Sequence, residues 1–377
     1  MCTIGIVVEY NPFHNGHIYQ IERIRSIYPD SVIVVAMSSH FTERGEISVL
    51  DKWDKTEIVL NNGIDVVLEI PFPFTNQSAD TFSYAALKLL NEFKVDVLFF
   101  GSESNSLSIL SKAANIQIKN KDFDSKVKEY INSGYNYPTS ISKAIYDFTK
   151  LKIKDSNDLL GISYIKQIII NDYNMRVKTI ERTNSFLDIE NDGEIISALN
   201  IREKIKKGTD ITPYVPKEVP NRVRKYDENE LFKLIKYKII SEKDNLINYH
   251  LVTEGIEKRL YEKVNKSNNL TDFIDSVKTK RFTYNRIRRI LINILVGFTK
   301  EDSKKYNDLE YIRVLGLTKR GKEHLNTIKK QCKLPIITKF KNFDMLNFEL
   351  KATQIYGLIM NDDNIAKKEV KNHVIMK

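Results

Sequence analysis

Residues 3–17 read TIGIVVEYNPFHNGH, and this stretch decides the fold. It opens with a short apolar run over residues 3–9 that is rich in β-branched side chains, which predicts a buried strand. A polar turn follows, and isoleucines at helical spacing then predict a helix over residues 17–28. A buried strand that leads directly into an amphipathic helix is typical of a parallel sheet covered on both faces.

The same alternation continues along the first half of the chain. Further strands are predicted at residues 31–37, 64–70, 95–100 and 175–181, and helices at residues 51–62, 80–93 and 194–207, with another helix after Asn157 as its cap. Right-handed crossovers turn such a series into an α/β fold, a Rossmann-like doubly wound parallel sheet. In sheets of this kind the ligand crevice lies beyond the carboxyl ends of the strands.

A proline-rich loop with Pro213, Pro216 and Pro220 predicts the boundary between two domains. We expect a catalytic domain over residues 1–212 and a mostly helical, basic domain over residues 213–377. The net charge of the chain is +10, but residues 1–100 carry 7 basic and 13 acidic side chains, so the remainder is strongly basic. A basic region attracts polyanions such as nucleic acid, although a lysine-rich solubilising surface is an equal alternative.

Several classes of protein are excluded by composition. Cys2 and Cys332 are the only cysteines, which rules out a disulfide framework and fits a reducing, cytoplasmic location. We expect both to be bystanders. No apolar run reaches the roughly 18 residues of a membrane span, so no membrane contact is expected. No GxxxxGK[ST] motif follows a strand, so a P-loop is excluded, and no protein partner is implied.

The turn after the first strand carries the strongest functional signal. His14 and His17 flank an Asn–Gly pair where a strand passes into a helix, at the crevice end of the sheet. Free N–H groups at the helix N-terminus form a natural phosphate seat, and Gly16 lets a ligand approach the backbone. The imidazoles can donate hydrogen bonds to phosphate oxygens. Surface or capping histidines are the alternative, and a zinc site lacks further ligands nearby, so no metal ligands are predicted.

This segment resembles the HxGH signature of the nucleotidyltransferase superfamily. A second superfamily signature, roughly Ile-Ser-Ser-Thr-x-Ile-Arg, corresponds to ISALNIR at residues 196–202. Ser197 and Arg202 match it, whereas Leu199 replaces the usual threonine and removes one hydroxyl contact to the triphosphate. The resemblance implies direct in-line attack on the α-phosphate of ATP, with His14, His17, Ser197 and Arg202 as the catalytic residues.

A narrower resemblance is to the tRNA(Met) cytidine acetate ligase family. It rests on VVEYNPFHNGH (7–17), the Arg44–Gly45 loop with DKW (51–53), QSAD (77–80), FGSE (100–103), NDLLG (157–161) and YIRVLG (311–316). The family is implied to activate acetate with ATP and Mg²⁺ as acetyl-adenylate. The acetyl group then passes to N4 of the wobble cytidine of elongator tRNA(Met). The implied ATP contacts are Val7, Glu9, Tyr10, Asn11, Pro12, Phe13, His14, Gly16, His17, Gln20, Gly101, Asn157 and Arg182.

Each of the later contacts has a plainer interpretation. Gly101 could be an ordinary turn after its strand, Asn157 could only cap its helix, and Arg182 could pair with Glu181 or Glu194. Contacts to tRNA are predicted at Arg44, Lys52, Arg286, Arg288, Arg289, Lys319 and Arg320, for which solvated helix charges are the alternative.

Two other functions stay open at this point. One is a small-molecule adenylyltransferase of coenzyme biosynthesis, against which the long basic region argues. The other is a non-catalytic RNA-binding protein on a nucleotidyltransferase fold, against which the retained His14, His17, Ser197 and Arg202 argue.

Overall fold

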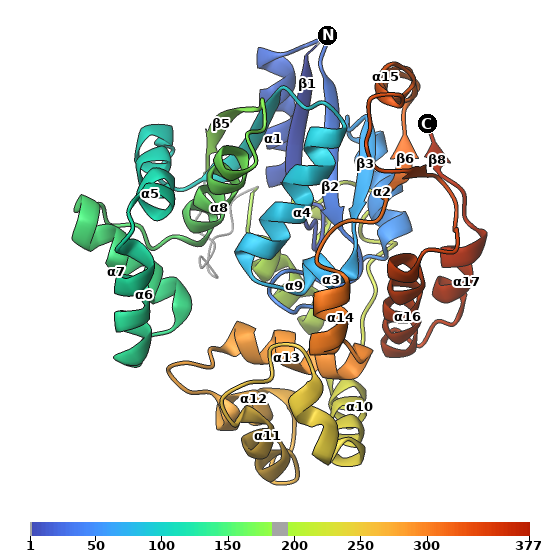
Figure 1. Ribbon diagram of the computed structural model, residues 1–377. Helices are drawn as coiled ribbons and strands as arrows, with labels where there is room; N and C mark the ends of the chain where they lie inside the picture. The colour runs from blue at the N-terminus through green and yellow to red at the C-terminus, as the bar shows by residue number, and fades with distance from the viewer. Residues whose placement is uncertain (1, 183–194) are drawn as a thin grey trace.

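The computed structural model describes residues 2–182 and 195–377. The described residues form an eight-stranded sheet in the order β5-β4-β1-β2-β3-β6-β7, with β8 paired to β6 (Figure 1). The strands are β1 (Thr3–Val8), β2 (Val32–Ser38), β3 (Val66–Ile70), β4 (Val97–Ser102), β5 (Arg176–Glu181), β6 (Ile312–Leu317), β7 (Ile336–Ile337) and β8 (Ile375–Met376). Strands β1 to β5 are parallel, which confirms the predicted doubly wound α/β fold.

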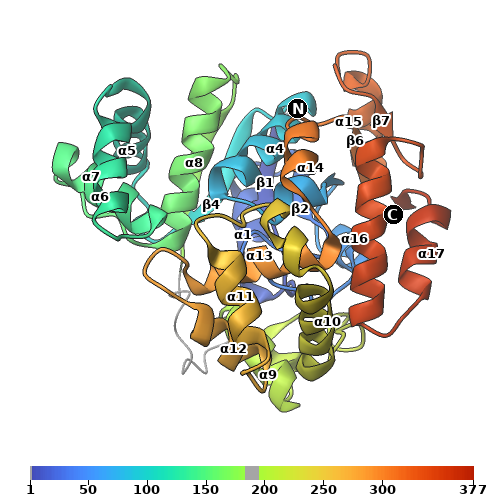
Figure 2. The same cartoon turned by 60° about the horizontal axis from the view of Figure 1, so that its bottom comes forward.

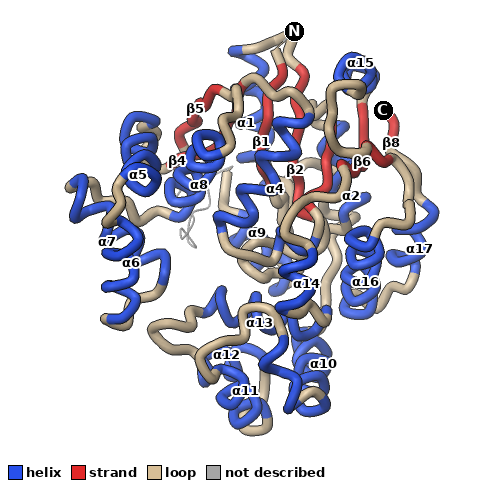
Figure 3. The backbone as a smooth tube through the Cα atoms, viewed as in Figure 1, coloured by secondary structure: helices blue, strands red, loops and turns tan. Residues whose placement is uncertain are grey.

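Helices cover both faces of this sheet (Figure 3). In the first half of the chain they are α1 (Asn15–Ile27), α2 (Lys52–Asn61), α3 (Phe72–Thr75), α4 (Ala79–Glu92), α5 (Leu107–Lys119), α6 (Phe123–Asn132), α7 (Tyr137–Thr149), α8 (Ser156–Ile170) and α9 (Ala198–Lys207). Two of the predicted helices begin elsewhere: α1 begins two residues earlier than the apolar spacing suggested, and α9 begins at Ala198. Glu194, where that second helix was expected to begin, lies outside the described residues.

The strands alternate their side chains between two separate cores, as the pleat of a strand requires. Val34 and Ala36 of β2 belong to the core under α4 and α8, whereas Val35 and Met37 belong to the core under α1 and α2. All seven residues of β2 are buried, so the continuous apolar run reflects a strand covered on both faces.

The second half of the chain is mostly helical. Its helices are α10 (Glu228–Ser241), α11 (Ile256–Val264), α12 (Leu270–Val277), α13 (Tyr284–Val296), α14 (Lys300–Lys305), α15 (Lys319–Ile328), α16 (Asp344–Ile359) and α17 (Asn364–Lys371), with short 3₁₀ turns at Thr212–Tyr214 and Lys243–Asn248. Helices α10 to α13 form a bundle near the carboxyl ends of the strands (Figures 1 and 2).

Residues 213–377 are mostly helical, as expected, but their last part also returns to the sheet with β6, β7 and β8. Strand β6 pairs antiparallel with β3, and every residue of β6 is buried. An uncovered β3 would expose a row of unpaired backbone groups at the edge of the sheet, and β6 covers it. The sheet is therefore mixed rather than wholly parallel.

Candidate active site

A cavity of about 1230 Å³ lies at the carboxyl ends of β1 and β4. The strand order reverses between these two strands, because β2 and β3 lie on one side of β1 and β4 on the other. Ligands bind at such a switch point in open α/β sheets. The walls come from the turn after β1, the loop after β2, the first turns of α8 and α9, and the loop that leads into α13. The predicted crevice is therefore present.

The two histidines begin helix α1 and face this cavity. His14 is the N-cap residue, and its Nδ1 accepts a hydrogen bond from the Gly16 N–H at 3.1 Å. His17 Nδ1 accepts from the His14 N–H at 3.2 Å, which completes a reciprocal capping box. A neutral imidazole that accepts at Nδ1 carries its proton on Nε2. Both rings therefore present an Nε2–H donor, and capping and ligand binding are compatible.

Electrostatics keeps both rings neutral. Burial, together with the charges of Arg182 and Arg202, lowers the pKa of His14 to about 3. Burial also holds the pKa of His17 well below its usual range, with smaller contributions from His14 and Arg182. The ring centroids are 3.8 Å apart, so two imidazolium charges would repel strongly at this distance. An anion bound here would therefore accept hydrogen bonds from the two neutral imidazoles, and the charges of Arg182 and Arg202 would attract it from nearby.

The second signature forms the start of α9. Ser197 is its N-cap, and the Ser197 hydroxyl accepts from the Asn200 N–H at 3.2 Å. One guanidinium nitrogen of Arg202 donates to the Asn11 carbonyl at 2.7 Å, and the other donates to Glu46 Oε1 at 2.8 Å. Arg202 thus ties the histidine turn to the loop after β2. All of these residues except Asn200 line the cavity, and so does Leu199.

Asn157 and Arg182, two residues predicted to contact the nucleotide, both lie beside the carboxylate of Glu103. Asn157 Nδ2 donates to Glu103 Oε1 at 2.5 Å, and Arg182 Nε lies 3.6 Å from the same oxygen. Asp155 is the N-cap position of α8, so the interpretation of Asn157 as the cap is wrong. Among the described residues the ion-pair partner of Arg182 is Glu103 rather than Glu181, and Glu194, the other predicted partner, lies outside the described residues. A Cβ on Gly101 would lie 3.2 Å from Arg182 Cγ, which explains the lack of a side chain there.

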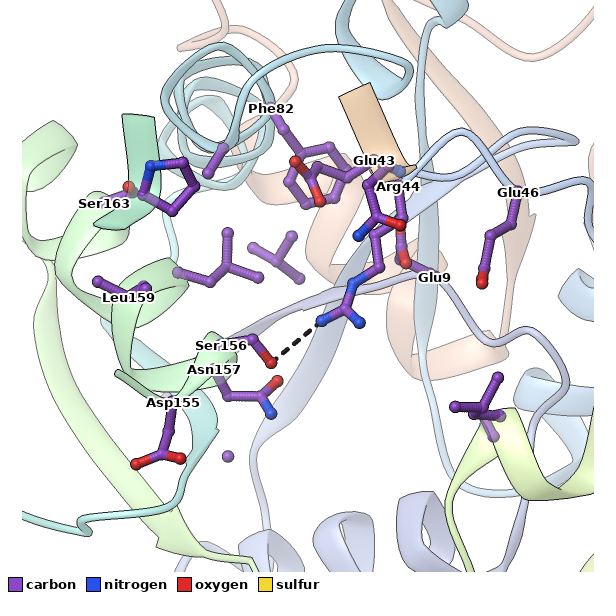
Figure 4. A pocket seen from close by; sticks show the side chains of 18 of the residues that line it. Glu9, Glu43, Arg44, Glu46, Phe82, Asp155, Ser156, Asn157, Leu159 and Ser163 are labelled. Atoms are coloured by element: carbon purple, nitrogen blue, oxygen red, sulfur yellow. Dashed lines mark hydrogen bonds between the residues drawn. The ribbon is translucent and has the colours of Figure 1, made fainter. Parts of the chain in front are cut away.

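The loop after β2 crosses the cavity to α8. Arg44 donates to the Ser156 hydroxyl at 3.1 Å, as Figure 4 shows. Gly45 has φ +72°, and a Cβ there would lie 2.6 Å from the Arg289 backbone nitrogen. Only glycine accommodates both the left-handed backbone and this close approach. The loop is therefore pressed against α13, which brings the helical bundle to the nucleotide site.

The three predicted arginines of α13 all line the cavity but are already hydrogen-bonded. Arg289 donates to Glu43 Oε1 at 2.7 Å, and Arg288 donates to the Gly45 carbonyl at 3.3 Å. Arg286 lies over the Phe282 ring at 4.1 Å and donates to the Thr253 hydroxyl at 3.1 Å. Their charges remain close to any ligand in the cavity.

Three predicted tRNA contacts are not brought to this cavity, and one of them cannot reach a polyanion at all. The Lys52 side chain is fully buried, and its Nζ lies 2.5 Å from Glu69 Oε1 and 2.7 Å from Glu369 Oε2. Helix α15 begins with Lys319 and Arg320. It lies beside the amino ends of the strands, at the opposite end of the sheet from α13 (Figure 1). Arg320 donates to the Ser31 carbonyl there. Burial therefore excludes Lys52 from contact with RNA, whereas Lys319 and Arg320 are only shown to lie away from this cavity.

One wall of the cavity was missed by reasoning from the sequence. Tyr135 and Tyr137 line it and are 40% and 50% exposed. Lys143 Nζ lies 4.6 Å from the Tyr135 ring centroid, and Lys154 also lines the cavity. Aromatic and lysine side chains are interleaved along residues 126–154, and this pattern was the available signal.

The described residues hold no group of three or more His, Cys, Asp or Glu side chains placed to bind a metal ion. Within the same part of the chain, no helix combines the length and apolar character needed to cross a membrane.

Comparison with known proteins agrees with this geometry. The family model for HIGH Nucleotidyl Transferase matches residues 1–372, which defines the class of protein. A tRNA(Met) cytidine acetate ligase of Caldicellulosiruptor saccharolyticus is 35% identical over 100% of this chain and 98% of its own length. One from Thermosipho africanus is 36% identical over 90% of this chain and 85% of its own. The chain therefore belongs to the tRNA(Met) cytidine acetate ligase family.

Solved structures show the same relationship. Thermotoga maritima TmcAL in its apo form superposes with a TM-score of 0.92 at 29% identity, over all of both chains. The same protein bound with alpha-thio ATP superposes with a TM-score of 0.89, again over all of both chains.

Proposed function

We propose that this chain is an ATP-dependent ligase that converts acetate to acetyl-adenylate and then acetylates N4 of the wobble cytidine of elongator tRNA(Met). The observation that carries the proposal is the pair of imidazole Nε2–H donors at the N-terminus of α1, on the wall of a cavity at the switch point of the sheet. The names of the relatives support the substrates, and a tRNA substrate fits a cytoplasmic location.

In the first step an acetate oxygen attacks the α-phosphate of ATP, and pyrophosphate leaves. Negative charge develops on the phosphate oxygens as the bond forms. His14 and His17 donate hydrogen bonds where that charge develops, and the positive end of the α1 dipole lies at the same place. Since acetate is itself the nucleophile, the step needs neither a covalent enzyme intermediate nor a cysteine. Positioning of the two substrates supplies much of the rate.

The nucleotide fits the side of the cavity formed by the ends of β4 and β5. There Gly101 leaves room beside the strand, and Asn157 and Arg182 can exchange their contact with Glu103 for contacts with the nucleotide. Arg202 also lines the cavity, close enough to His14 for its charge to lower the pKa of that ring, and therefore near the expected phosphates. Most of the predicted ATP contacts of the 7–20 segment also line the cavity: Val7, Glu9, Tyr10, Asn11, His14, Gly16, His17 and Gln20. Pro12 and the fully buried Phe13 do not line it, and we leave them out of the proposed contacts.

Mg²⁺ would enter with the triphosphate. Magnesium usually keeps several waters and takes substrate phosphate oxygens as ligands, so a protein-only cage is not required. The described residues contain no such cage, which fits this mode of binding. The ion would offset phosphate charge, and the residues named above would position the substrates.

The RNA fits between two walls of the cavity. One wall is positively charged, because α13 contributes Arg286, Arg288 and Arg289 to it. Arg44 extends into the cavity from the loop after β2. On the other, Tyr135 and Tyr137 offer rings for unstacked bases of the anticodon loop. Such a cleft suits a single-stranded loop better than a duplex.

One assay tests the proposal. The purified protein is incubated with labelled acetate, ATP and bulk tRNA, and the tRNA is digested to nucleosides. We expect labelled N4-acetylcytidine that depends on ATP. Pyrophosphate release with another acceptor and no acetylcytidine would point to a small-molecule adenylyltransferase. Binding of tRNA without ATP turnover would point to a non-catalytic RNA-binding protein.

A further inference from the structure

Most carboxyl groups on the cavity wall have a cation as partner. The ion pairs are Glu43–Arg289 (2.7 Å), Glu46–Arg202 (2.8 Å), Glu103–Arg182 (3.6 Å), Asp80–Lys166 (3.2 Å), Glu203–Lys206 (3.5 Å) and Glu254–Arg281 (3.0 Å). Asp155 and Glu181 have no such partner among the described residues, but both are exposed to water. Glu9 is the exception, because it is partly buried and forms no ion pair within the described part of the chain.

The position of Glu9 is tightly held. It directly follows the last residue of β1, and one of its carboxylate oxygens accepts from the Glu43 N–H at 2.6 Å. Below it, the fully buried Lys55 donates to the Glu9 carbonyl at 3.0 Å and to the Ser38 and Ser39 carbonyls. The ends of β1 and β2 are thereby joined, and the other Glu9 oxygen has no hydrogen-bond partner among the described residues.

Glu9 lies between the expected positions of the ATP phosphates and of the cytosine base. Figure 4 shows it between Arg44 and Glu46 on the cavity wall. It lies five residues before His14, at the phosphate side of the cavity, while Glu43 and Tyr164 face it from the loop after β2 and from α8. Phe82, Leu159 and Ser163 add a mostly apolar chamber beside it that could hold a planar base.

We propose that the Glu9 carboxylate accepts the proton that the N4 amine of the cytidine loses during acetyl transfer. This rests on the proposed function and concerns only its second step. The N4 lone pair forms the C–N bond to the acetyl carbon, and the bond from that carbon to the adenylate oxygen breaks. AMP leaves with the electron pair, and the N4 proton passes to Glu9 and then to water.

The chemistry explains why a base is needed in this step alone. Acetate has no proton to lose when it attacks ATP, whereas the exocyclic amine of cytosine is a weak nucleophile that becomes acidic as the new bond forms. The pKa of Glu9 is raised to about 7, mainly by burial and also by the charges of Glu43 and Glu46, while the hydrogen bond from the Glu43 N–H and the charge of Arg44 act in the opposite direction. Lys55 and Tyr164 are the other ionisable groups that face Glu9. A base with a pKa near neutrality combines proton affinity with availability.

The test separates the two half-reactions of one variant. In Glu9→Gln the amide oxygen can still accept from the Glu43 N–H while the basic group is lost. Adenylation is followed as acetate-dependent exchange of labelled pyrophosphate into ATP, and transfer as single-turnover acetylation of tRNA from synthetic acetyl-adenylate. The amide of the variant can also replace the carboxylate in the proposed contact of residue 9 with ATP, so we expect exchange to persist, whereas transfer should fall about 10²- to 10⁴-fold. Asp80→Asn makes the same change at a paired cavity carboxyl and should leave both unchanged.

The pH dependence of transfer provides a second readout. A base works only when deprotonated, so the single-turnover rate of the unaltered protein should rise with pH through about 7. That rise should be absent in Glu9→Gln. Unchanged transfer in the variant, or equal loss of exchange and transfer, would overturn the role of Glu9. An unaltered protein that performs exchange but acetylates no tRNA would contradict the proposed function and, with it, this role.

Discussion

Two clusters of charged side chains lie close together in this molecule and differ in their access to water. The cavity at the ends of β1 and β4 holds arginines and carboxylates that a ligand can reach. Behind the loop after β2, a buried network joins Lys52 and Arg313 to the carboxylates of Glu69, Glu349 and Glu369. The side chains of this network are at most 2% exposed.

The difference shows what each cluster does. The buried network joins α2 and β3 to β6, α16 and α17, so it attaches the end of the chain to the nucleotide-binding sheet. The charges of the cavity instead hold loops that a substrate could displace, such as the contact between Arg44 and Ser156. Residues of the same type therefore stabilise the fold in one place and prepare for a polyanion in the other.

The largest effect is expected from breaking the buried network. Lys52→Met leaves three buried carboxylates with Arg313 as their remaining partner among the residues of the network, so the free energy of unfolding should fall by about 3–5 kcal/mol. Chemical denaturation measures this loss. Lys319→Met, at an exposed lysine, should change stability by no more than about 0.5 kcal/mol. Equal stability of the two variants would show that the network contributes nothing.

The next largest effect is expected at the cavity. His17→Ala removes one Nε2–H donor from the phosphate site and should slow acetate-dependent pyrophosphate exchange by about 10²- to 10³-fold. Binding of tRNA should persist, which shows that the protein is folded. His324→Ala changes a histidine of α15 that bonds to the Phe93 carbonyl, and it should leave exchange unaltered. A His17→Ala variant with normal exchange would remove the proposed role of the imidazoles.

A smaller effect is expected on the tyrosine wall. Tyr137→Ala should weaken the apparent affinity for tRNA by about 1–3 kcal/mol if a base stacks on the ring. Exchange, which needs no RNA, should stay the same. Tyr237→Ala is a matched control, because Tyr237 is 71% exposed on α10 and does not line the cavity. Similar affinities for the two variants would exclude this wall from tRNA binding.

The smallest effects are expected from single arginines, and they distinguish the predicted RNA contacts of α13 from those of α15. Arg288→Ala should weaken tRNA binding and lower the slope of log affinity against log salt by about one, because one phosphate contact is lost. Arg320 lies at the opposite end of the sheet, so Arg320→Ala should leave both quantities unchanged. Titrations at several salt concentrations distinguish these results, and the reverse pattern would move the RNA surface to α15.

Much of the fold could be predicted because short stretches of sequence indicate its strands and helices. Buried strands such as β2 appeared as continuous apolar runs, and the turn that contains His14 and Gly16 lay at the junction of a strand and a helix. The antiparallel pairing of β6 with β3 was not predictable, because it joins residues 246 to 251 positions apart and leaves no periodic trace in either segment.

The candidate site shows the same division. His14, His17, Ser197 and Arg202 were found because their motifs sit where strands meet helices. Lys52 was misplaced because a buried lysine and a surface lysine are identical in sequence. Glu103 was quoted only within a family stretch, although it holds both Asn157 and Arg182.

The sequence by itself determined the doubly wound sheet, the phosphate-binding turn and the family, since each depends on neighbouring residues that share one element. Only the tertiary structure decided which charges reach the cavity, where the end of the chain attaches, and that Glu9 forms no ion pair among the described residues. Burial and pairing are properties of residues brought together from distant parts of the chain, so no local pattern can encode them.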